Sequence, residues 1–165
     1  MKTNKIAMMG LLTALAFVFS YIEFLLPINI GVPGAKIGLA NLVIVVAIYI
    51  IGERNAFVLS CIRVILVSLT FGNMAMMLYS LAGAMLSFLV MILAKKSNKL
   101  SATGVSVLGG VFHNVGQIIV AMFMLDTAYI LYYLPFLMII GTISGIVIGL
   151  LASAIISRLK KLRIN

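Results

Sequence analysis

Six long apolar runs, separated by short polar or glycine-containing turns, account for nearly all of this 165-residue chain. Hydrophobic residues make up 64% of the sequence and charged residues 9%, and the mean hydropathy is +1.29. Water-soluble domains are about half apolar and roughly a quarter charged, and a small domain has too little interior to bury a larger apolar share. The sequence therefore predicts an all-α integral membrane protein whose runs cross the lipid bilayer as helices.

The predicted spans form a single six-helix transmembrane domain over residues 1–165. They cover about residues 6–26, 37–51, 56–71, 74–94, 102–125 and 135–156, with breaks at glycine, proline and charged residues. The second and third spans are shorter than the roughly 20 residues that a span usually needs, so neighbouring protein must shelter their ends. Residues 129–134 contain three tyrosines, which favours a position in the headgroup layer.

Lysine and arginine residues are distributed unevenly between the two predicted sides of the membrane. With a cytoplasmic N-terminus, the inner segments hold all the bases except Lys36, on the outer side, and Arg63, within a span. The positive-inside rule therefore predicts a multi-pass plasma-membrane protein with both termini in the cytoplasm. The net charge of +9 does not indicate a nucleic-acid partner, because the bases lie in short clusters between apolar runs.

Arg63 lies near the middle of the third span, where an ionised side chain is costly unless it faces the bundle interior or a cavity. A guanidinium group binds a carboxylate or phosphate through two parallel hydrogen bonds, so one interpretation is a cation that holds an anionic ligand. The alternative is a structural arginine that pairs with Glu23 or Asp126 or donates to backbone carbonyls.

His113, Asn114 and Gln117 fall within about one turn in the middle of the fifth span. His113 and Gln117 share a face, and Asn114 is adjacent to it. Single polar residues in membrane helices often link neighbouring helices by hydrogen bonds. Three in one turn exceed what packing needs, which favours the lining of a polar cavity.

Two further pairs have a functional and a structural interpretation. Lys36 and Asn41 flank the start of the second span after a glycine-containing loop, an arrangement that suits the binding of an anion. Lys36 is equally consistent with a lysine at the membrane interface. Gly10 and Ala14 place small residues one turn apart on the first span. Such spacing permits close helix contact, either within the bundle or with a partner helix.

The residue types needed for common catalytic sites are missing. The chain has three acidic residues, in separate segments, and one cysteine, Cys61, within an apolar run. It contains no aspartate-rich DDxxD motif, no GxSxG and no HExxH. We therefore predict no catalytic residues, no metal site and no cofactor, and expect binding or transport rather than an enzyme.

Four segments together resemble a known family. They are Pro33-Gly34-Ala35-Lys36-Ile37-Gly38-Leu39-Ala40-Asn41, Arg63-Val64 with Phe71-Gly72, Leu78-Tyr79-Ser80-Leu81-Ala82-Gly83, and His113-Asn114-Val115-Gly116-Gln117. In this order they are similar to motifs of the Gx transporter family, often labelled heptaprenyl diphosphate synthase component I. Members of that family resemble the substrate-binding S components of energy-coupling factor transporters.

The resemblance implies an S-component-like bundle that binds a small molecule from outside. It also implies docking on a transmembrane coupling subunit driven by ATPases, with Gly10 and Ala14 in the place of the partner-contacting motif. We expect uptake of a small anionic molecule, such as an isoprenoid, a quinone precursor or a vitamin-like compound. Its cavity would open to the outside and be lined by Lys36, Asn41, Arg63, Tyr79, His113, Asn114 and Gln117. The alternatives are a non-catalytic membrane subunit of heptaprenyl diphosphate synthase, acting in isoprenoid-quinone biosynthesis, and a scaffold in a membrane redox complex.

Overall fold

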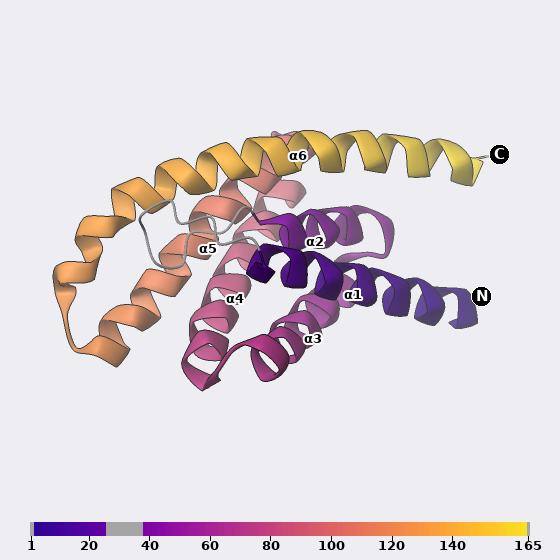
Figure 1. Cartoon of the computed structure of the whole chain (residues 1–165). Helices are drawn as coiled ribbons and strands as arrows, with labels where there is room; N and C mark the ends of the chain where they lie inside the picture. Colours follow the sequence, from indigo (N-terminus) through magenta and orange to yellow (C-terminus); the bar gives the residue numbers. More distant parts are fainter. Residues whose placement is uncertain (1, 26–37, 165) are drawn as a thin grey trace.

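The computed structural model describes residues 2–25 and 38–164, and every regular element in these ranges is helical. The six predicted helices are confirmed (Figure 1). Figure 1 also shows the beginning of α1 and the end of α6 directed toward the same side of the molecule. The elements are α1 (Lys2–Leu25), α2 (Leu39–Ile50), α3 (Glu53–Phe71), α4 (Met74–Lys96), α5 (Ala102–Leu125), the short 3₁₀ helix η1 (Ala128–Tyr133) and α6 (Leu134–Ile164).

Five of the described helical segments are long and apolar enough to cross a membrane. The exception is α2, which has 12 residues and spans about 18 Å at 1.5 Å per residue, against about 30 Å for the hydrocarbon core of a bilayer. Eight of its residues are buried. It contacts α1, α3, α5 and α6, so protein rather than lipid surrounds this short helix.

Local sequence signals set several helix ends, and some of these ends differ from the ends of the predicted spans. Helix α3 begins at Glu53 rather than at residue 56, which places an acidic side chain in its first turn, where the helix dipole favours negative charge. The side chain of Asn73 accepts a hydrogen bond of 2.8 Å from the Met76 N–H and caps α4. Helix α6 continues beyond residue 156 to Ile164, and this added part is rich in basic residues, which the dipole favours near the C-terminal end of a helix.

Helices α4, α5 and α6 pack at backbone contact, and glycine makes this possible. A Cβ atom on Gly116 of α5 would lie 2.7 Å from the Ala82 carbonyl oxygen of α4. On α6, a Cβ on Gly145 would lie 2.6 Å from the Cα of Val107 in α5. Gly141 and Gly149, one turn to either side of Gly145, are similarly close to α5. These contacts fix the mutual rotation of the three helices.

The basic ends of several helices meet at one end of the bundle. Lys95 donates hydrogen bonds to the Ile48 carbonyl oxygen (3.1 Å) and to Glu53 (3.3 Å). Lys95 and Lys160 both lie over the ring of Tyr49, with Nζ 5.4 and 5.9 Å from its centroid. The ends of α2, α4 and α6 and the start of α3 therefore lie together, as expected if one membrane face receives the lysine-rich segments.

Candidate functional site

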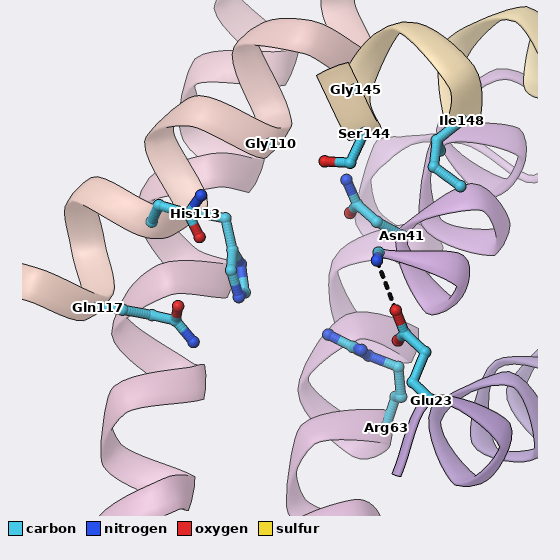
Figure 2. A pocket seen from close by; sticks show the side chains of 11 residues that line it. Glu23, Asn41, Arg63, Gly110, His113, Gln117, Ser144, Gly145 and Ile148 are labelled. Carbon is cyan, nitrogen blue, oxygen red and sulfur yellow. Dashed lines mark hydrogen bonds between the residues drawn. The ribbon is translucent and has the colours of Figure 1, made fainter. Parts of the chain in front are cut away.

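A small polar cavity lies where α1, α2, α3, α5 and α6 converge. Its volume is about 70 Å³, and Figure 2 shows the side chains of Asn41, Arg63, His113 and Gln117 directed into it. The cavity is lined by Glu23, Gly38, Asn41, Arg63, Gly110, His113, Asn114, Gln117, Ser144, Gly145 and Ile148. Five of the seven predicted ligand-binding residues thus lie around one space.

A second cavity of about 50 Å³ adjoins the first. It is lined by Ser20, Glu23, Arg63, Val64, Val67, Ser68, Ser80 and His113. Glu23, Arg63 and His113 line both cavities, so the two cavities meet at these three residues. The polar interior consequently extends from α5 and α6 across α3 to α1 and α4.

The Nε atom of Arg63 is buried and has no hydrogen-bond partner among the described residues. Glu23 interacts with it electrostatically, although the two side chains form no ion pair within 4 Å. A buried donor without a partner is costly, so native proteins rarely leave one without water or a ligand to accept its proton. Arg63 therefore has hydrogen-bonding capacity directed at the cavities.

Glu23 connects α1 to the beginning of α2. Its Oε1 accepts hydrogen bonds from the backbone N–H groups of Gly38 and Leu39, the latter at 3.0 Å. These N–H groups belong to the unpaired first turn of a helix, where a carboxylate is favourable. Gly38 has a φ of 83°, a left-handed conformation that glycine adopts without the strain imposed on other residues. Glu23 and Gly38 together fix the position of Asn41 relative to Arg63.

The polar residues of α5 have different roles. Asn114 is buried and its Nδ2 donates a hydrogen bond of 2.7 Å to the Leu137 carbonyl oxygen of α6. This bond ties α5 to α6 and orients Asn114, whose side chain also borders the cavity. His113 and Gln117 are directed toward the space that Arg63 also faces (Figure 2). The trio thus combines one interhelical link with two cavity-lining groups.

The remaining predicted site residues lie elsewhere. Tyr79 is half-buried on α4 and lines neither cavity, although its neighbour Ser80 does. Lys36 falls outside the described residues. Gly10 and Ala14 are exposed on α1, where they border an apolar groove of about 690 Å³ between α1 and α3. A Cβ on Gly10 would meet nothing within 4 Å, so this glycine does not pack within the described bundle.

Sequence reasoning missed Glu23 and Ser144 as lining residues. Glu23 carried a usable signal, because an acidic residue late in an apolar span is costly unless it faces a partner or a cavity. Ser144 carried none, since a lone serine in a glycine-containing span is ordinary. The described residues contain no group of three or more His, Cys, Asp or Glu side chains able to hold a metal ion.

We expect Glu23→Ala to lower the free energy of unfolding by about 2 kcal/mol, because two backbone N–H groups lose their acceptor. Glu23→Gln should lower the free energy of unfolding by roughly half as much, since its amide oxygen still accepts both hydrogen bonds. Thermal unfolding in detergent would measure the difference. Asp126→Asn, an exposed change that tolerates the left-handed backbone there, is the control. Equal midpoints for wild type and Glu23→Ala would contradict the capping role.

A family model described as heptaprenyl diphosphate synthase component I matches residues 12–155. The match includes every residue that lines the two cavities. No curated protein matches the chain, and no solved structure matches it. The family indicated by the sequence motifs is confirmed, and this membrane protein belongs to the heptaprenyl diphosphate synthase component I family.

Proposed function

We propose that the chain is the substrate-binding membrane subunit of a transporter, similar to the S component of an energy-coupling factor transporter. It takes up a small molecule that carries an anionic group. The observation that supports this proposal is Arg63, whose buried Nε has no partner among the described residues and which borders both polar cavities. An oxyanion is the ligand group that best matches a guanidinium in a site shielded from bulk water.

The charges around the cavity narrow the class of ligand. Arg63 contributes a positive charge and Glu23 a negative one, so a purely anionic group would be attracted by one and repelled by the other. A ligand that pairs its anionic group with a neighbouring hydroxyl, amine or amide satisfies both. Asn41 and Gln117 each offer an amide donor and an amide acceptor that can fix its orientation.

The size of the cavity also limits the ligand. Volumes of about 70 and 50 Å³ are well below the roughly 300–1,000 Å³ of pockets that enclose drug-sized molecules. The charged head of an isoprenoid or quinone precursor fits this space, and so does a very small vitamin-like compound. A longer apolar tail would have to leave the cavity between the helices.

The exposed face of α1 supports docking to a coupling subunit. Gly10 and Ala14 lie open beside the groove between α1 and α3, where a partner helix can approach closely. Cytoplasmic ATPases would then act through that partner. No paired carboxylates line the described cavities, which favours binding over acid–base catalysis.

The family description supports a second candidate, a non-catalytic membrane subunit of heptaprenyl diphosphate synthase. Native mass spectrometry of the protein, purified gently from its own membranes, separates the two candidates. The transporter proposal expects a bound small anion, a second membrane protein and ATPases. Copurification of a prenyl synthase whose activity requires this chain, with no small molecule bound, would instead support the enzyme subunit and overturn transport.

A further inference from the structure

A long apolar groove runs along the outside of the bundle, separate from the polar cavities. Its volume is about 780 Å³, and side chains of α3, α4 and α5 form its walls. Gly116 and Ala82 line it at a place where the backbones of α5 and α4 are in contact. Met85 and Leu89 of α4 line it and are 55% and 56% exposed. The groove is thus open to the surrounding lipid along its length.

The groove has a charged residue pair at one end only. Glu53 and Arg54, at the start of α3, are the ionisable residues among those that line it. Glu53 holds Lys95 and Lys96 at 3.3 and 3.5 Å, which brings the end of α4 to the same place. Glu53 therefore pairs with two lysines, and with the neighbouring Arg54 the cluster holds three bases and one carboxylate, a net positive charge.

The bases in this cluster are not equivalent. Lys95 is engaged in the fold, because it also donates to the Ile48 carbonyl oxygen and lies over the Tyr49 ring. Arg54 is exposed, and the Lys96 side chain is 65% exposed. Arg54 and Lys96 are consequently the two cations that remain accessible at the charged end of the groove.

The length of the groove corresponds to one leaflet of a bilayer. Along α4 it extends from Ile92 to Ala82, about 15 Å at 1.5 Å per residue, which is half of the roughly 30 Å hydrocarbon core. Its charged end belongs to the segments that the positive-inside rule places on the cytoplasmic side, where anionic lipids are enriched.

We propose that this groove binds one anionic phospholipid. An acyl chain lies along α4 over Met85 and Leu89, and the headgroup phosphate contacts Arg54 and Lys96. The apolar walls match the chain, and the two accessible cations match the phosphate. This site is independent of the transport proposal, because it shares no residue with either polar cavity.

Native mass spectrometry of the full chain in detergent tests the proposal directly. The probes are phosphatidylglycerol and phosphatidylcholine with identical acyl chains, added at equal concentrations. We expect the first lipid adduct to favour phosphatidylglycerol by roughly 5- to 25-fold, since each base beside an anionic lipid contributes about 5-fold. The double variant Arg54→Gln/Lys96→Gln should bring the two lipids close to equal occupancy, whereas Lys99→Gln/Arg158→Gln should keep the preference.

A second pair of variants distinguishes a lipid bound in the groove from a lipid that is attracted to basic residues anywhere on the surface. Met85→Gln/Leu89→Gln places polar groups along the proposed chain path at exposed positions, and the control below carries two equally exposed amides, so any cost of facing lipid is common to both variants. Two polar groups beside an acyl chain should weaken lipid binding by roughly 1 kcal/mol or more. Phosphatidylglycerol occupancy should therefore fall by about 5-fold or more. The matched control is Leu93→Gln/Leu150→Gln, two exposed positions outside the groove. Equal binding of both lipids to the wild-type protein would overturn the proposal. So would an unchanged preference in Arg54→Gln/Lys96→Gln, or an unchanged occupancy in Met85→Gln/Leu89→Gln.

Discussion

Arg63→Ala is expected to abolish binding of the native ligand while the protein remains folded. The change removes the positive charge that faces the ligand and leaves the Glu23 carboxylate to repel it. Loss of one partner from a buried charge pair costs about 3–5 kcal/mol, which corresponds to at least a roughly 100-fold weaker affinity. Folding should be little affected, because the Nε of Arg63 donates no hydrogen bond to the described residues.

Arg63→Lys and Arg158→Ala complete this experiment. Lysine keeps the charge but loses the planar two-point contact, so its affinity should fall between those of wild type and Arg63→Ala. Arg158 is exposed near the end of α6 and does not line a cavity, so its removal should leave binding unchanged. The fraction of purified protein that carries its small molecule, measured by native mass spectrometry, gives the comparison. Wild-type occupancy in Arg63→Ala would rule out the proposed role of this arginine.

Gly145→Leu is expected to prevent assembly of the bundle. A Cβ at this position would lie 2.6 Å from the Cα of Val107 and 3.1 Å from the Ser106 carbonyl oxygen, and these are backbone atoms that cannot move aside. Leucine would therefore separate α5 from α6 and open the cavity that both helices line. Overpacking a core costs about 1–3 kcal/mol where side chains can adjust, and a backbone clash should exceed that range.

Gly145→Ala provides a graded version of the same test. Alanine is the better helix former by about 1 kcal/mol, so helix propensity alone would make Gly145→Ala more stable than wild type. A loss of stability must therefore come from the clash of the added Cβ with α5. We expect a clearly lower thermal midpoint in detergent for Gly145→Ala and an aggregated or unstable product for Gly145→Leu.

The matched control is Gly10→Ala, which changes the same residue type on α1 where a Cβ meets nothing within 4 Å. Its midpoint should equal that of wild type or rise slightly. A Gly145→Ala midpoint as high as that of Gly10→Ala would show that the α5–α6 contact is looser than the structure indicates.

The sequence was sufficient to predict the helical membrane fold, because apolar runs and turn residues are local signals. It was also sufficient to identify Asn41, Arg63, His113 and Gln117 as cavity residues. A strongly polar side chain within an apolar run is costly in lipid, so its presence alone indicates an enclosed polar site. The family followed from the same residues, since the motifs that contain them lie within the matched range.

The partners of these side chains depended on the tertiary structure. Helical periodicity determines which residues share a face, but not how that face is rotated toward neighbouring helices. Backbone contacts at Gly116 and Gly145 set this rotation, and they leave Tyr79 outside the cavity. The reach of Glu23 to the first N–H groups of α2 is likewise a contact between separate helices. Six helices are thus determined by local sequence, whereas the assembly of Glu23, Arg63 and His113 into one site is determined by packing.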